Sequence, residues 1–212
     1  MTLEDILGLS PVIPVLVVED VAQAVPLGRA LVAGGLPVLE VTLRTPAALQ
    51  CLERMAGEIE GAVVGAGTVL TPAMREAVAR AGARFCVSPG LIEGETDEGP
   101  TPLLPGVATA TELMAGLAAG FTRFKLFPAN VAGGIEALKA FAGPFAHARF
   151  CPTGGVNAKN AADYLALANV VCVGGSWVAP PDAVRAGDWA RITALAREAA
   201  ALAPRAPSPT ER

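Results

Sequence analysis

The stretch Phe124-Lys125-Leu126-Phe127-Pro128 reads as a short buried strand that ends at a proline. Near-continuous apolar runs of this kind are typical of strands covered on both faces, as in parallel sheets. Similar short runs recur along the chain, and most are followed by a stretch with the spacing of a helix. Alternating strands and helices predict an α/β protein with a parallel sheet.

The strand-and-helix unit is repeated eight times. We expect strands at residues 14–18, 38–43, 63–67, 84–88, 102–104, 122–127, 149–151 and 170–173. A short helix at 3–9 precedes them. Further helices are expected from Asp20 to residue 33, from Thr45-Pro46, from Thr71-Pro72, and over 109–119, 134–142, 157–166 and 188–202. Residues 92–101 are acidic and glycine-rich, so any helix there has one or two turns at most.

Eight such units favour closure into a single (β/α)₈ TIM barrel over an open doubly wound sheet. The length of 212 residues, with 52% of them hydrophobic, suits one barrel domain over residues 1–203. The proline-rich end, 204–212, is expected to be disordered. In such a barrel the catalytic groups lie at the carboxyl ends of the strands and on the loops that follow.

Charge and composition exclude several classes of partner. The net charge is −4 and there is no basic block, which argues against nucleic acid. The acidic first residues lack the positive region of a signal peptide, and no apolar run is long enough to cross a membrane. We therefore expect a cytoplasmic protein. The hydrophobic share also suggests that part of the outer surface is buried in an oligomer.

Cysteine and histidine offer little chemistry. The single histidine, His147, sits in a polar approach to a strand and is read as an exposed loop residue. The four cysteines are widely spaced and are read as reduced, buried side chains: Cys51, Cys86, Cys151 and Cys172. Neither a zinc site nor a Ser-His-Asp triad is expected. Lysine, carboxylate, hydroxyl and arginine groups are left as catalysts.

Lys125 stands out among only three lysines. Lys139 and Lys159 fall in polar, helix-like stretches and are expected to be solvated, whereas Lys125 has apolar neighbours. Burial disfavours the ammonium form and lowers the pKa of a lysine. A neutral amine is a nucleophile that forms a Schiff base with a ketone or aldehyde. The alternative is a strand lysine that extends its amine to solvent.

Glu40 is the second unexpected charge in an apolar strand. Side chains alternate along a strand, so Leu39 and Val41 face the helices while Glu40 and Thr42 face the barrel interior, with Arg44 at the mouth. By the same alternation Lys125 faces the interior. A buried glutamate is costly unless it has a partner or a task. It is either a proton shuttle for Schiff-base chemistry or half of a buried ion pair.

Small polar residues end three further strands. They are Gly67-Thr68, Thr153-Gly154-Gly155 and Gly174-Gly175-Ser176. Glycines after strands seven and eight of a barrel often bind phosphate through backbone N–H groups. The alternative is that they form tight turns only, since neither segment matches a phosphate-binding loop motif.

Several segments resemble one known family, the 2-keto-3-deoxy-6-phosphogluconate (KDPG) and 4-hydroxy-2-oxoglutarate (KHG) aldolases. The resemblance runs in order from about Pro14 to Ala199 and rests on 39–45, 64–70, 88–90, 150–155 and 174–177, which read LEVTLRT, VGAGTVL, SPG, FCPTGG and GGSW. It implies a class I aldolase on a (β/α)₈ barrel, with no metal and no cofactor, assembled as a homotrimer. The reaction implied is cleavage of a phosphorylated 2-keto acid to pyruvate and D-glyceraldehyde 3-phosphate, as in the Entner-Doudoroff pathway.

Matching motif to motif, the resemblance assigns roles to single residues. Lys125 would form the Schiff base and Glu40 would be the general acid/base. Arg44 and Thr68 would hold the pyruvate carboxylate, and Pro89 would line the site.

At the other end of the substrate, the resemblance gives phosphate binding to Gly154, Gly155 and Ser176. It gives Thr153 a part in reading substrate stereochemistry.

Two departures from the family pattern are visible. The segment from Gly90 to Pro102 is shorter and more acidic, and Asn130 stands where the family usually has glutamate. Because of the first departure, the resemblance does not predict the fourth helix or the rim of the site. Alternatives are a KHG aldolase, an aldolase for the galactonate epimer, a phosphosugar isomerase without an imine, or a non-catalytic assembly protein.

Overall fold

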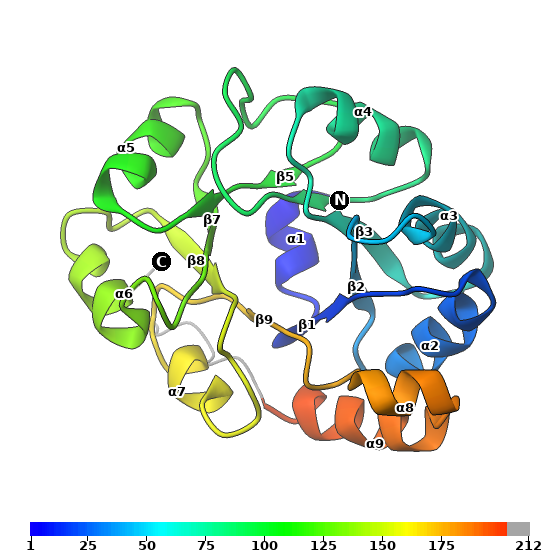
Figure 1. Cartoon of the computed structure of the whole chain (residues 1–212). Helices are drawn as coiled ribbons and strands as arrows, with labels where there is room; N and C mark the ends of the chain where they lie inside the picture. Colours follow the sequence, from blue (N-terminus) through cyan, green and yellow to red (C-terminus); the bar gives the residue numbers. More distant parts are fainter. Residues whose placement is uncertain (203–212) are drawn as a thin grey trace.

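The computed structural model describes residues 1–202, and the expected disordered tail at 204–212 lies outside this part. The chain forms a ring of parallel strands surrounded by helices (Figure 1). The strands are β1 Val12–Leu16, β2 Val38–Thr42, β3 Val63–Gly67, β4 Cys86–Val87, β5 Leu103–Leu104, β6 Gly106–Val107, β7 Arg123–Leu126, β8 Arg149–Pro152 and β9 Val173–Gly175.

Strand pairing closes the ring into the predicted eight-part barrel. One run of pairs is β5-β4-β3-β2-β1-β9 and the other is β6-β7-β8. Strands β5 and β6 are two halves of the fifth part, separated by Pro105, whose carbonyl accepts from Lys125 N–H. Bridges from Phe150 to Val170 and from Thr153 to Gly174 join β8 to the segment that ends in β9.

Helices pack outside the ring. They are α1 Leu3–Leu7, α2 Val21–Ala33, α3 Ala48–Glu58, α4 Pro72–Arg80, α5 Ala110–Ala118, α6 Gly134–Ala142, α7 Ala161–Leu165, α8 Pro181–Ala186 and α9 Trp189–Ala200. Helix α1 is the exception, since it lies across one end of the ring (Figure 1). Its Leu3, Ile6 and Leu7 pack against interior residues such as Phe85. The side chains of Asp20 and Thr71 cap α2 and α4, the helices predicted to begin there.

Several element boundaries differ from the sequence prediction. Helix α3 begins at Ala48 rather than Thr45, because the Thr45 hydroxyl donates to the Val18 carbonyl and does not cap the helix. The eighth strand begins at Val173 rather than Val170, because the segment changes partner from β8 to β1. Helix α8 was not predicted, and neither was β6.

No helix forms between β4 and β5, where one or two turns were the most expected. Buried Arg75 of α4 holds this loop instead. Its guanidinium donates to the carbonyls of Thr96 and Thr101 and to the carboxylate of Glu95. Gly99 packs directly on the guanidinium, where a side chain would collide. In the fourth unit, hydrogen bonds from a buried arginine therefore order the loop where other units have a helix.

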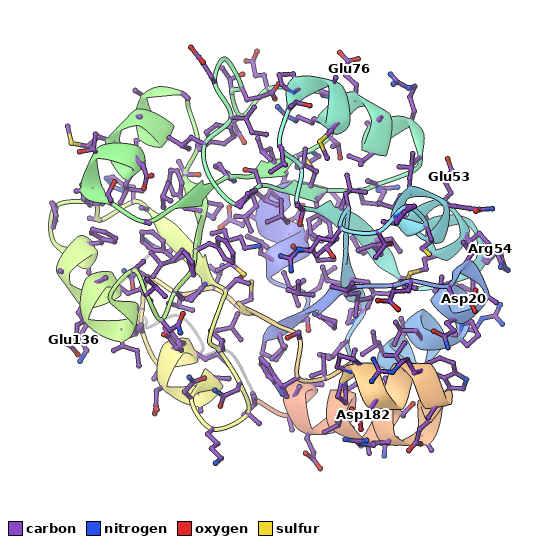
Figure 2. All side chains as sticks on the ribbon, viewed as in Figure 1. Asp20, Glu53, Arg54, Glu76, Glu136 and Asp182 are labelled. Atoms are coloured by element: carbon purple, nitrogen blue, oxygen red, sulfur yellow. The ribbon has the colours of Figure 1, made fainter. Side chains whose placement is uncertain are left out.

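The apolar residues form two clusters, one inside the ring and one between ring and helices. Phe124, Leu126, Leu39 and Val41 lie in the outer cluster, as predicted. The charged side chains labelled in Figure 2, on or beside the helices, point outward. Within residues 1–202, no helix is both long and apolar enough to span a membrane.

Candidate active site

Lys125 and Glu40 meet inside the barrel. Both are 3% exposed, and Lys125 Nζ lies 3.5 Å from Glu40 Oε1. The bare Cα of Gly67 leaves room for the carboxylate, because a Cβ there would overlap the Glu40 side chain. The ion-pair alternative for Glu40 is thus realised. It is also the geometry that a proton shuttle beside a reacting amine requires.

An aromatic ring covers the lysine amine. Lys125 Nζ lies 4.9 Å from the centroid of the Phe127 ring, two residues further along the chain. The ring face attracts an ammonium and shields the amine from bulk water. The sequence argument used Phe127 only as an apolar neighbour. The signal for its position was strand alternation, which places residues 125 and 127 on the same face.

Arg44 and Thr68 lie together, as their strand ends predict. Arg44 Nε donates to Thr68 Oγ1 at 3.1 Å. Thr68 directly follows β3 and has φ of 62°, a left-handed backbone conformation that is rare for a threonine. Arg44 is exposed, so its remaining guanidinium donors are free to face an incoming anion.

Pro89 follows β4 and lies against the fifth part of the ring. Its carbonyl contacts Gly106, and a Cβ at Gly106 would overlap the Pro89 backbone. The Ser88 hydroxyl donates to the Gly90 carbonyl at 2.6 Å, which fixes the turn.

A hollow of about 300 Å³ opens at the carboxyl ends of the strands. It brings together Arg44, Phe127, Thr153, Gly154, Gly155 and Ser176, with an apolar wall from Val17, Val156, Ala179, Pro181 and Val184. Thr68 and Pro89 are not part of its lining, and Lys125 lies beneath Phe127. A larger hollow of about 460 Å³ lies at the other end, near the start of β3, and contains none of the predicted site residues.

The glycine turns after β8 and β9 present backbone N–H groups beside the hollow. Gly154 and Gly155 have φ of 95° and 79°, which only glycine adopts readily. Within residues 1–202, the backbone N–H groups of Gly155 and Ser176 donate no hydrogen bond. Thr153 is buried below them, and the absence of a side chain at Gly174 makes room for its hydroxyl. The turns therefore offer unpaired donors beside the hollow.

Below the lysine, two thiols fill the barrel interior. Cys151 is the register partner of Lys125 on β8. A hydrogen bond with Cys151, together with complete burial, raises the pKa of Cys172 well above its ordinary value. All four cysteines are buried and unpaired by disulfides, as predicted, and His147 and the other two lysines are exposed. Among residues 1–202, no group of three or more His, Cys, Asp and Glu side chains is placed to hold a metal ion.

Comparison with known proteins gives one consistent result. The family model described as "KDPG and KHG aldolase" matches residues 3–195. The KHG/KDPG aldolase of Escherichia coli K12 is 54% identical over 199 residues, covering 92% of this chain and 93% of that protein.

Two solved structures extend the comparison. The KDPG aldolase of Legionella pneumophila, with pyruvate captured as a covalent carbinolamine, is 48% identical with a TM-score of 0.91, covering 93% of this chain and 97% of that one. The enzyme of Zymomonas mobilis ZM4, with 3-phosphoglycerate, is 50% identical with a TM-score of 0.89, covering 97% and 98%.

Proposed function

This chain belongs to the family of KDPG and KHG aldolases, and we propose that it cleaves 2-dehydro-3-deoxy-6-phosphogluconate through an imine on Lys125. The products are pyruvate and D-glyceraldehyde 3-phosphate, and the reaction is reversible. The observation that carries the proposal is the buried pair of Lys125 and Glu40 under a hollow lined by anion donors. The relatives named above carry the same activity in their names, and one holds pyruvate in a covalent carbinolamine.

The chemistry follows from the two buried side chains. The Lys125 amine adds to the C2 ketone to give a carbinolamine, which loses water to form an iminium ion. Glu40 takes the proton of the C4 hydroxyl while the C3–C4 bond breaks. The electron pair of that bond forms the C2=C3 bond of the enamine, and the π pair of the iminium C=N bond moves to the nitrogen. The aldehyde departs and Glu40 returns a proton to C3 of the enamine. Hydrolysis then releases pyruvate and the free amine.

The two anionic ends of the substrate need separate donors. We assign the carboxylate to Arg44 and Thr68, whose side chains are already joined by a hydrogen bond. Pro89 packs beside this end. The phosphate goes to the backbone N–H groups of Gly155 and its neighbour Gly154.

On the same side, Ser176 adds a backbone N–H and a hydroxyl to the phosphate site. Buried Thr153 lies between this site and the lysine, where it would contact the hydroxyl-bearing carbons and help select their configuration.

A second substrate is favoured by one specific observation. The Escherichia coli relative is named for both KHG and KDPG. 4-Hydroxy-2-oxoglutarate has a carboxylate at its distal end, to which the same N–H groups can donate. Pyruvate release from both substrates, assayed side by side, decides whether this chain shares that breadth.

Borohydride trapping tests the central assignment. Borohydride added with pyruvate should reduce the imine to a stable secondary amine, inactivate the enzyme and add mass at Lys125 only. Exposed Lys139 and Lys159 are internal controls on the same chain. Modification at either of these, or no modification, would rule out Lys125 as the nucleophile. The isomerase alternative forms no imine and would leave the protein unmodified.

We further propose that the enzyme is a cytoplasmic homotrimer. The support is the family resemblance and the chain's hydrophobic composition. Light scattering on the purified protein measures the assembly directly, and a monomer at micromolar concentration would contradict it.

A further inference from the structure

The turn after β8 is held by hydrogen bonds to two successive carbonyl groups. The Gly154 carbonyl accepts from Asn130 N–H at 3.1 Å. The Gly155 carbonyl accepts from Asn160 Nδ2 at 3.0 Å and from Asn157 Nδ2 at 3.3 Å. In a trans peptide the C=O and N–H bonds point in opposite directions. Tying both carbonyls to the asparagines therefore turns the N–H groups of residues 155 and 156 to the other side.

These two N–H groups donate to no acceptor within residues 1–202, and residues 155 and 156 both line the hollow. Consecutive N–H groups held in a turn make a concave anion site. Two glycines with positive φ have many other backbone conformations available. Something outside their own backbone must select this one.

The side chain of Asn160 makes hydrogen bonds that can hold the turn in this conformation. Its Nδ2 donates to the Gly155 carbonyl while its Oδ1 accepts from Asn157 N–H at 2.8 Å. Asn157 in turn accepts from Lys159 N–H at 2.9 Å. The amide thus joins the turn to the start of α7 through a donor and an acceptor used at once.

We propose that Asn160, assisted by Asn157, is a positioning residue that orients the Gly155 and Val156 N–H groups for the substrate phosphate. Asn160 does not touch the substrate. This inference rests on the proposed function, and it adds a residue that selects for the phosphorylated substrate without taking part in the imine chemistry.

The variant that isolates this role is Asn160→Asp. It has the same shape and keeps an oxygen to accept from Asn157 N–H, so the turn retains its local tie. It loses the donor to the Gly155 carbonyl. Ala158→Asp is the matched control, because Ala158 is exposed and the change adds the same charge in the same turn without removing a donor.

The assay is aldol addition of pyruvate to two acceptors, D-glyceraldehyde 3-phosphate and D-glyceraldehyde, which differ only in the phosphate. For Asn160→Asp we expect kcat/KM with the phosphorylated acceptor to fall at least 10-fold, about the upper end for one net hydrogen bond, since the new carboxylate also repels phosphate. The value with D-glyceraldehyde should stay within about 2-fold, and borohydride trapping of pyruvate should be unchanged. Asn160→Ala should show the same selectivity without the added charge.

Three results would overturn the inference. They are an equal fall with both acceptors, an equal effect from Ala158→Asp, and no fall with either asparagine variant. A wild-type enzyme without preference for the phosphorylated acceptor would overturn it together with the phosphate site. Trapping at Lys125 would then still support the aldolase assignment, so the two failures are distinguishable.

Discussion

Replacing Glu40 by glutamine tests whether the buried carboxylate moves protons or only balances a charge. The amide has the same shape, fits the space beside Gly67, and can still accept from Lys125 Nζ, now 3.5 Å from Glu40 Oε1. It cannot carry a proton. General acid–base catalysis by a positioned group contributes about 10²–10⁴-fold, or about 2.7–5.4 kcal/mol of barrier. We expect kcat to fall by about that factor.

The same change has a bounded effect on stability. Removing one partner of a buried ion pair costs about 3–5 kcal/mol, but the glutamine amide offsets part of this cost by still accepting from Lys125 Nζ. We therefore expect a loss below about 3 kcal/mol, and each kcal/mol lowers the Tm of a chain this size by about 2–4 °C. The control is Thr42→Val on the same strand, which removes the buried hydrogen bond to the Leu16 carbonyl and should lower Tm without lowering kcat.

Three measurements separate the two roles of Glu40. Calorimetry gives Tm, borohydride trapping gives the amount of imine formed, and deuterium exchange at the pyruvate methyl group reports proton transfer at carbon. If Glu40 moves protons, the glutamine variant should keep its fold and still be trapped by borohydride at long incubation, but it should exchange the methyl protons of pyruvate slowly. Near wild-type turnover with a lowered Tm would refute it, because Glu40 would then be only the ion-pair partner.

The remaining predictions concern the rim of the site and two structural features. Gly155→Leu should harm use of the phosphorylated substrate and leave pyruvate exchange almost intact, since Asn130 occupies the space beside Gly155 and φ is positive there. Arg44→Ala should impair both reactions. Equal damage to both reactions from Gly155→Leu would mean that the phosphate site is wrongly placed. Arg75→Leu should destabilise the protein by about 3 kcal/mol in chemical denaturation, because buried acceptors of the 95–101 loop lose their donors. Glu112 caps the start of α5 by accepting from the N–H groups of Ala108 and Thr109, and the bond from Ala108 lowers the pKa of Glu112. The stability that this carboxylate contributes is present at neutral pH and is lost as pH falls through that lowered pKa. Glu112→Gln should flatten this acid limb of the stability profile, and an unchanged limb would contradict the capping role.

The barrel and its central pair were accessible from the sequence because they depend on short-range rules. Strand alternation alone determines that residues 40 and 125 face inward, although they are 85 positions apart. Parallel strands then place Arg44 and Thr68 at one end of the ring. These inferences need only the parity of a strand and its direction, and both are visible in the sequence pattern.

The boundaries that were mispredicted depend on competition between partners. Val170 has the composition of a strand residue, but it bridges to β8, and only three residues further on does the chain pair with β1. The missing helix after β4 depends on Arg75, a charged residue of α4 that is buried. Burial of an arginine is decided by acceptors far along the chain, which local patterns do not reveal.

The asparagines after β8 were read as the start of a helix, yet α7 begins only at Ala161. Asparagine side chains compete for backbone groups, so the same residues can cap a helix or secure a turn. Here Asn157 and Asn160 serve the turn, because Gly155 presents a carbonyl that no strand satisfies. The turn that we propose for the phosphate is thus held by side-chain hydrogen bonds to the backbone, and these cannot be predicted from periodicity.

Local donors must also overcome an unfavourable overall charge. The chain is net −4 and the substrate is anionic at both ends, so long-range attraction cannot select it. The labelled acidic groups on the helices, Glu53, Glu76, Glu136 and Asp182, lie at the periphery of the ring (Figure 2), where the ionic atmosphere screens charges beyond about 10 Å at 0.1 M salt. At contact distance the balance reverses, because Arg44 and N–H groups that have no acceptor in the described part of the chain, residues 1–202, line the hollow. In the proposed phosphate site, selectivity would therefore depend on how accurately two peptide groups are oriented, and a single amide such as that of Asn160 would alter it without changing the net charge of the protein.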